Sequence, residues 1–205
     1  MDKTTKNQIN TIGMALSFTN LCLKSDGDGL YKYRLSLRLI PSGQNHPGVR
    51  QNLRLTQVLL DMNRQAAAAY AAFETGRVRG VTKAVEKFRN LGRDLIDLKA
   101  LAQIESEVRG SQHDEKFSKF QGLVSVLMTA LTADRDGLNS YRDFLKVNEA
   151  NAADAKAWKN LLDDTDKRIS VNSRGISMLS ALIKGDAERL DELIAKAVID
   201  ARGHA

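Results

Sequence analysis

The chain has 205 residues, of which 42 % are apolar and 27 % are charged. That length allows one domain, or a compact domain with a helical extension, and the apolar content suffices for a core. The single cysteine, Cys22, excludes an intrachain disulfide and disfavours a small secreted scaffold, so a cytoplasmic location is expected. No run of about 18 apolar residues occurs, so we expect neither a membrane-spanning helix nor a membrane partner.

The net charge of +6 is concentrated in the first half of the chain. Residues 1–110 hold 17 of the 31 Lys and Arg residues but only 10 of the 25 Asp and Glu residues. No acidic residue occurs between Gly29 and Leu60. A basic region of this kind can meet nucleic acid, an anionic surface or an acidic protein face.

Residues 14–40 are predicted to form a β-hairpin. The glycine-rich segment 25–29 separates two apolar runs, which is typical of a hairpin turn. In the second run apolar and polar residues alternate, so a strand would carry aromatic and leucine side chains on one face and cations on the other. The alternating residues are Tyr31, Tyr33, Leu35, Leu37 and Leu39 against Lys32, Arg34, Ser36 and Arg38. The first run could instead be helical, because Ile9, Ile12, Leu16 and Leu23 lie near helical spacing.

Everything after a loop at residues 41–48 is predicted to be helical. The expected helices cover residues 49–75, 81–109, 112–148 and 152–184, followed by a short helix from residue 186. Residues 134–137 are a candidate kink in the third of these. Helices of about 27 to 33 residues span about 40–50 Å, and short connections between them favour antiparallel neighbours.

The apolar positions of these helices recur at alternating spacings of three and four, which is the pattern of coiled-coil-like packing. Two polar residues, Asp134 and Asn172, occupy positions of this apolar seam. We expect them to fix the register of the bundle at some loss of stability. No internal repeat at a fixed period is apparent.

The motifs of common catalytic and metal sites are absent from the sequence. It has no phosphate-binding loop, no nucleophile elbow and no EF-hand loop. Its three histidines and one cysteine lack the spacing of a zinc site. We therefore expect no enzymatic activity, no cofactor and no metal.

The basic residues of the first half are the candidate binding residues. Phosphate binding needs several such contacts, and an acidic protein face needs the same charges. The candidates are Lys32, Arg34 and Arg38 on the predicted strand, Arg50 and Arg54 on the first helix, and Arg77 and Arg79 at the next turn.

The sequence thus predicts a mainly α protein. Residues 1–48 would form an N-terminal segment with a basic β-hairpin, and residues 49–205 an elongated bundle of about four long helices plus a short C-terminal helix. The expected function is that of a non-enzymatic structural or assembly protein that binds a protein partner or itself through its basic N-terminal half and long helices. An assembly or inhibitor protein of viral or mobile-element type fits this description. The alternative is a DNA- or RNA-binding protein that uses the basic hairpin face.

Overall fold

The computed structural model describes every residue except 1–2, 41–45, 96–97, 109–114, 150–153 and 204–205. Within these residues the chain forms seven helices and no strand. The helices are α1 (Lys3–Arg38), α2 (Pro47–Glu74), α3 (Val78–Gly92), α4 (Leu98–Glu107), α5 (Glu115–Asn148), α6 (Ala155–Lys184) and α7 (Ala187–Gly203).

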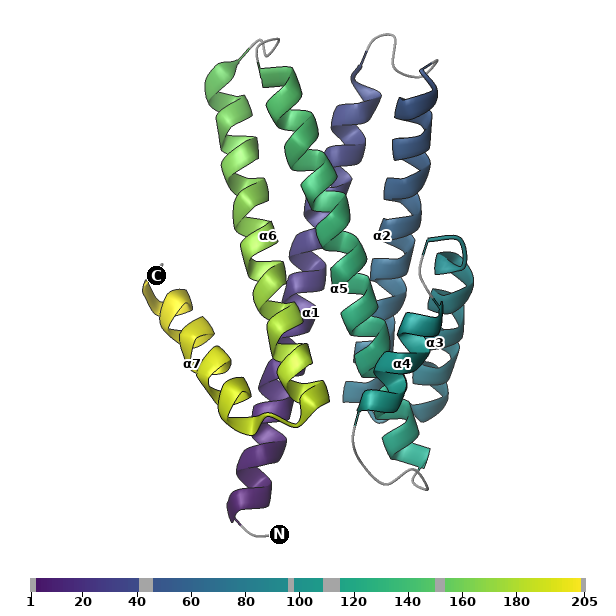
Figure 1. Cartoon of the computed structure of the whole chain (residues 1–205), viewed down its shortest axis with the longest axis vertical. Coiled ribbons are helices and arrows are strands. Elements are labelled where there is room, and N and C mark those ends of the chain that lie inside the picture. The colour runs from purple at the N-terminus through teal and green to yellow at the C-terminus, as the bar shows by residue number, and fades with distance from the viewer. Residues whose placement is uncertain (1–2, 41–45, 96–97, 109–114, 150–153, 204–205) are drawn as a thin grey trace.

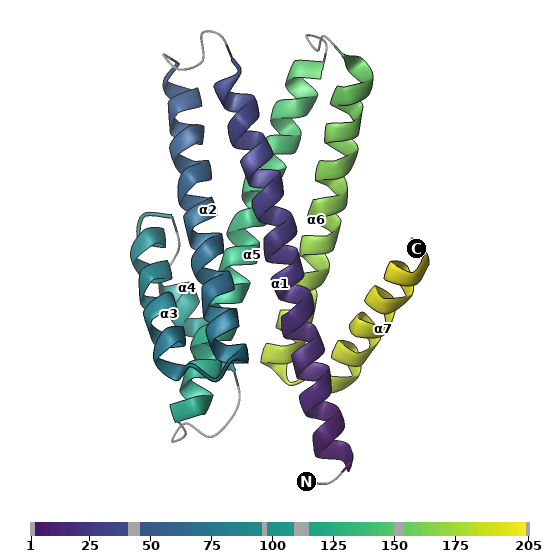
Figure 2. The same cartoon turned by 180° about the vertical axis from the view of Figure 1, so that it is seen from behind.

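The four long helices α1, α2, α5 and α6 form an elongated bundle (Figure 1). α1 packs against α2, α5 and α6, and α5 also packs against α2 and α6. α3 packs on α2 and α5, α4 on α5, and α7 on α6 and α1. Seen from behind, α1 runs between α2 and α6 (Figure 2). Residues 14–38 are therefore part of one of the central helices of the bundle.

The predicted β-hairpin is wrong, because residues 14–38 belong to one continuous helix, α1. Two series of apolar residues at helical spacing interleave in its second part and imitate the period of a strand. Tyr33 and Leu37 are buried in the core, whereas Tyr31, Leu35 and Leu39 are 53 %, 39 % and 80 % exposed on another face. Residues four apart share one face of a helix, so each series is helical by itself.

The other helix predictions agree with the structure at four places and fail at one. The short helix expected from residue 186 is confirmed as α7. The helices expected at 49–75, 112–148 and 152–184 are confirmed as α2, α5 and α6. The helix expected at 81–109 is wrong, because α3 ends at Gly92 and α4 begins at Leu98. α5 continues through residues 134–137 without a break.

The chain contains an internal repeat, contrary to the expectation from its sequence. The pattern Asp-x-Asp-Gly-Leu-x-x-Tyr-Arg-x-x-Leu occurs at residues 26–37 of α1 and again at residues 134–145 of α5. Seven of the twelve positions are identical. α1 and α5 are therefore equivalent helices.

The helices that follow α1 and α5 are equivalent as well. Thr56 and Thr165 are both buried and donate to a carbonyl of their own helix, at 2.9 and 2.7 Å. Gly76 and Gly185 both end their helix with a φ of 68°, a left-handed conformation that favours glycine. We call α1–α3 the first half and α5–α7 the second half. In Figure 1 the C-terminal ends of α1 and α5 lie at the same end of the bundle, and α3 and α7 lie on opposite outer sides.

The glycines of the repeat allow α1 and α5 to cross closely. A Cβ added to Gly29 would lie 2.6 Å from Leu138 Cδ2, and one added to Gly137 would lie 2.7 Å from Leu30 Cδ2. Each half thus supplies a glycine to receive the other half's leucine. One turn further, the equivalent rings of Tyr33 and Tyr141 stack with their centroids 5.0 Å apart. The glycine, leucine and tyrosine that form this crossing are identical in the two copies of the repeat.

The two halves differ in how their last helix packs. A Cβ on Gly80 would lie 2.9 Å from the Cβ of Ala72, so the absence of a side chain lets α3 lie close against α2. The equivalent residue of α7 is Arg189, whose side chain needs room, and α7 diverges from α6 (Figure 1). A hollow of about 690 Å³ between α1, α5, α6 and α7 is lined largely by apolar residues, including Ile12 and Leu182.

The duplication provides a stability test at Gly175. A Cβ there would lie 2.9 Å from Cys22 Sγ. The residue equivalent to Gly175 in the first half is Ala66, and the residue equivalent to Cys22 in the second half is Ala130. We expect Gly175→Ala to lower the free energy of unfolding by about 1 kcal/mol, because overpacking outweighs the gain in helix propensity. Cys22→Ala in the same chain should restore it, since the pair then copies Ala66 and Ala130.

Urea denaturation of the wild type, both single variants and the double variant measures this coupling. A coupling free energy of about 1 kcal/mol or more is expected for residues in contact. Additive effects of the two substitutions would contradict the equivalence of these positions.

Candidate functional site

A polar layer crosses the middle of the bundle and involves all four long helices. The Nδ2 of Asn63 on α2 donates to Asp134 on α5, and the Nδ2 of Asn172 on α6 donates to Asp26 on α1, at 2.6 and 2.7 Å. The same two amide groups donate to backbone carbonyls, Asn63 to Leu23 O at 2.8 Å and Asn172 to Leu131 O at 2.9 Å. Asp134 and Asn172, which the sequence predicted as polar residues of the apolar seam, lie in this layer. Asp26 and Asn63 belong to it as well, but the sequence pattern did not predict them.

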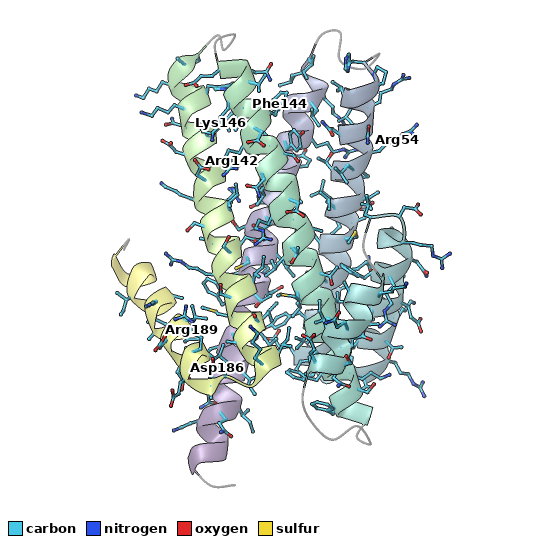
Figure 3. All side chains as sticks on the ribbon, in the orientation of Figure 1. Arg54, Arg142, Phe144, Lys146, Asp186 and Arg189 are labelled. Atoms are coloured by element: carbon cyan, nitrogen blue, oxygen red, sulfur yellow. The ribbon has the colours of Figure 1, made fainter. Side chains whose placement is uncertain are left out.

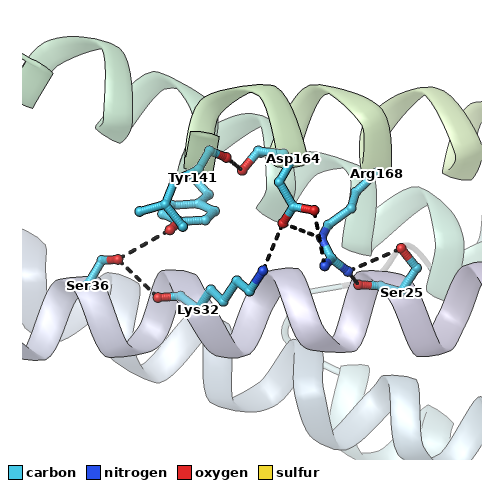
Figure 4. Close-up of polar contacts among 8 residues, drawn as sticks. Ser25, Lys32, Ser36, Tyr141, Asp164 and Arg168 are labelled. Carbon is cyan, nitrogen blue, oxygen red and sulfur yellow. Dashed lines mark hydrogen bonds and ion pairs between the residues drawn. The ribbon is translucent and has the colours of Figure 1, made fainter. Parts of the chain in front are cut away.

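Lys32 is placed apart from the other predicted cations of α1. Residues two apart point about 200° apart on a helix, whereas on a strand they share a face. The Nζ of Lys32 therefore lies 2.9 Å from Asp164 on α6, as Figure 4 shows. Arg168 also binds Asp164, at 3.0 Å, and donates to Ser25.

This cluster of Lys32, Asp164 and Arg168 links α1 to α6, and its two cations change the pKa of Asp164. Burial opposes ionisation of Asp164, but the hydrogen bonds and charges of Arg168 and Lys32 prevail and lower its pKa below 3.8. On the α5 side, Ser36 Oγ and Tyr141 Oη lie 3.3 Å apart (Figure 4). Lys32 is thus part of the bundle's internal contacts.

Three of the predicted cations come together in a groove between α1 and α2. Arg34 and Arg38 lie one turn apart on α1, and Arg54 faces them from α2. The hollow between them measures about 540 Å³, and its floor is almost entirely apolar. It is lined by Arg34, Arg38, Leu53, Arg54, Gln57 and Val58, and we call it the cationic groove.

Arg50 extends the positive charge along α2. It lines an adjoining hollow with Pro47, Gln51 and Arg54, near the end of the bundle where α1 and α2 are joined. Figure 3 shows Arg54 on α2 close to the same end. Tyr31, Leu35 and Leu39 add exposed apolar surface on α1 next to the groove's arginines.

The arginines of the groove have no acidic partner within the described part of the chain. The Nε atoms of Arg34 and of its equivalent in the second half, Arg142, are both buried without a hydrogen-bond acceptor, so the two halves differ in their ion pairs. In the second half, the equivalent Arg142 has Asp143 at 3.7 Å and Asp166 at 3.8 Å. The first half has Leu35 and Gln57 at those two acidic positions, and Arg54 in place of Asp163.

Arg77 and Arg79 lie elsewhere. They follow Gly76, at the end of the bundle opposite to the α1–α2 connection (Figure 1). Arg77 donates from Nε to Thr75 Oγ1 at 2.8 Å, and both arginines are exposed. The structure therefore brings Arg34, Arg38, Arg50 and Arg54 together and separates Lys32, Arg77 and Arg79 from them.

The repeat is the sequence feature that would have identified this arrangement. It pairs Arg34 with Arg142 and shows which charges differ between the two halves. Among the residues that the structure describes, no group of three or more His, Cys, Asp or Glu is placed to hold a metal ion. In the same residues, no helix combines the length and apolarity needed to cross a bilayer.

Fold and groove together define a duplicated helical bundle with a cationic groove on its first half. Comparisons with protein-family models, curated proteins and solved structures found no match to this chain.

The cluster around Asp164 gives a second stability test. Lys32 is 41 % exposed, so we expect Lys32→Ala to lower the free energy of unfolding by less than about 1 kcal/mol. Asp164→Asn leaves the largely buried Arg168 without its carboxylate and should cost about 1–3 kcal/mol. Chemical denaturation measures both; a larger loss from Lys32→Ala than from Asp164→Asn would contradict the placement of Arg168.

Proposed function

We propose that this chain is a non-enzymatic binding and assembly protein that docks an acidic, amphipathic segment of a partner protein in the cationic groove. The observation that carries this proposal is the difference between the two halves. Both halves form the same pair of long helices, so the fold does not require unpaired arginines at the groove. The second half supplies acidic partners at the equivalent positions, and the first half leaves its arginines available.

The groove's chemistry favours a partner with both carboxylates and apolar side chains. Exposed ion pairs contribute little binding energy each, about 0–1 kcal/mol, so charge alone gives weak binding. The apolar floor formed by Leu53 and Val58, with Tyr31 and Leu35 beside it, adds surface that binding would remove from water. An amphipathic helix laid in such a groove uses both contributions.

Nucleic acid is the second candidate ligand, because Arg34, Arg38, Arg50 and Arg54 could contact phosphates equally well. The apolar floor favours the protein partner, since phosphate recognition makes no use of it. The proposal places the protein in the cytoplasm, where Cys22, a buried free thiol, would stay reduced.

The test grafts second-half residues onto the groove. Arg54→Asp with Gln57→Asp copies Asp163 and Asp166, which the equivalent helix tolerates. Fluorescence anisotropy would follow binding of three probes: a synthetic amphipathic helix with Leu on one face and Glu on the other, poly-L-glutamate, and duplex DNA. We expect the amphipathic helix to bind best and the graft to weaken it at least about tenfold, or about 1.4 kcal/mol.

A matched control places two new carboxylates on α6. Lys159→Asp with Asn160→Asp changes the charge by the same amount as the graft, at two exposed residues, and should leave binding nearly unchanged. If the control variant weakened binding as much as the graft, the loss would come from the change in net charge and not from the groove, which would contradict the proposal. Preference for DNA, with a steep loss of affinity between about 50 and 200 mM salt, would favour the nucleic-acid function.

A further inference from the structure

Two buried oxygen atoms in the polar layer lack a hydrogen-bond donor, and they belong to the same pair of side chains. They are Oδ1 of Asp26 and Oδ1 of Asn172, and both residues are 0 % exposed. The orientation of the Asn172 amide is fixed, because Leu131 O can only accept and must face Nδ2. Both hydrogens of Nδ2 are then used, one on Leu131 O and one on Asp26 Oδ2.

Two acceptors without a donor are costly inside a protein, and one proton satisfies both. A protonated carboxyl group and an amide form a cyclic pair with two hydrogen bonds. The amide N–H donates to one carboxyl oxygen, and the carboxyl O–H donates to the amide oxygen. The first of these bonds is already present at 2.7 Å, and the two unsatisfied atoms are those that the second would join.

We propose that Asp26 is protonated in the folded protein and donates from Oδ1 to Oδ1 of Asn172, so that this proton holds α6 against α1 and α5. Release of the proton leaves a carboxylate facing a carbonyl oxygen in a buried site. The bundle then loses one of the three hydrogen bonds that Asn172 makes in the polar layer, and the two facing oxygen atoms weaken the packing of α6 against the other helices. The protein thereby carries a switch that responds to pH.

Most of the groups around the pair favour a neutral Asp26, and one cation, Arg168, opposes it. From α5, Asp134 is fully buried, and from α2 only the neutral amide of Asn63 faces the layer. From α1, the Cys22 thiol lies nearby, its pKa raised to about 12 by burial and by Asp26. From α6, Arg168 is the one cation, and it is held by Asp164 and Ser25.

The direction of the pKa values agrees with this geometry. Burial raises the pKa of Asp26 to about 7, against the opposing effects of the Asn172 hydrogen bond and Arg168. Burial and the neighbouring Asp26 raise the pKa of Asp134 well above 3.8, although the Asn63 bond lowers it. Two carboxyl groups this close in a dry interior favour the form in which neither is charged.

The sign of the pH effect follows from linkage. Between about pH 4 and pH 7 the folded state keeps a proton on Asp26 that the unfolded state has lost. Stabilisation by this group is complete below the unfolded pKa and is lost as the pH rises through about 7. In that interval one retained proton changes the folding equilibrium about tenfold per pH unit.

The experiment compares Asp26→Asn with Asp28→Asn, an exposed carboxyl two residues away. The amide introduced by Asp26→Asn can donate to Asn172 Oδ1 in place of the proton, so this variant should be more stable than the wild type at pH 8. It should also lose the tenfold change per pH unit that Asp26 contributes, while the contribution of Asp134 remains, whereas Asp28→Asn should keep both contributions. Urea denaturation at several pH values measures both; an unchanged pH dependence in Asp26→Asn would overturn the proposal.

A direct measurement on the wild type keeps the test independent of that variant. Carbon-13 NMR of the Asp26 carboxyl should titrate near pH 7, and infrared spectroscopy at pH 5 should show a protonated carboxyl band that Asp26→Asn removes. A carboxyl ionised at pH 5 would refute the shared proton. If Na⁺ or Mg²⁺ stabilised the wild type but not Asp26→Asn, the group between Asp26 and Asn172 would be a bound cation and not a proton, and the proposal would be wrong.

Discussion

The close crossing of α1 and α5 is the constraint on which the rest of the structure depends. Gly29 and Gly137 remove the side chains that would keep these helices apart, and Leu138 and Leu30 fill the space. Only at this short separation can the polar layer next to the crossing reach across four helices with two asparagines. The crossing also fixes where α2 and α6 pack. The repeated sequence pattern reflects this contact, because the glycine, leucine and tyrosine that form it are identical in both copies.

The polar layer gives the bundle a register that an all-apolar core would not define. An asparagine at a core position is satisfied in one alignment of the helices and unsatisfied in others. Here Asn63 and Asn172 each bind one carboxyl and one backbone carbonyl of the two crossing helices. A shift by one turn would leave two carboxyl groups buried without donors, which costs far more than the loss of a few apolar contacts.

Much of the helical content could be predicted from the sequence, and the boundaries of α2, α5 and α6 followed from apolar spacing and from glycine at Gly185. α1 was misassigned because its inner and outer apolar rows interleave, so that Tyr31 and Tyr33 are neighbours in an alternating pattern although they point to different environments. That error also grouped Lys32 with Arg34. The cationic groove depends on the direction in which each cation points from α1. That direction follows from the spacing of the residues only once the segment is known to be a helix.

Duplication followed by divergence explains how one chain combines a fixed core with a variable surface. At the crossing, residues of one half pack against the equivalent residues of the other half or against their neighbours in sequence. A substitution there therefore has to fit the packing of both halves. Outer positions carry no such constraint, and there Arg54 stands opposite Asp163 in the alignment of the halves, and Gly80 opposite Arg189. The first difference opens a cationic groove and the second turns α7 away from the bundle. The features that distinguish the halves therefore lie outside the crossing, at positions that the shared packing of α1 against α5 does not fix.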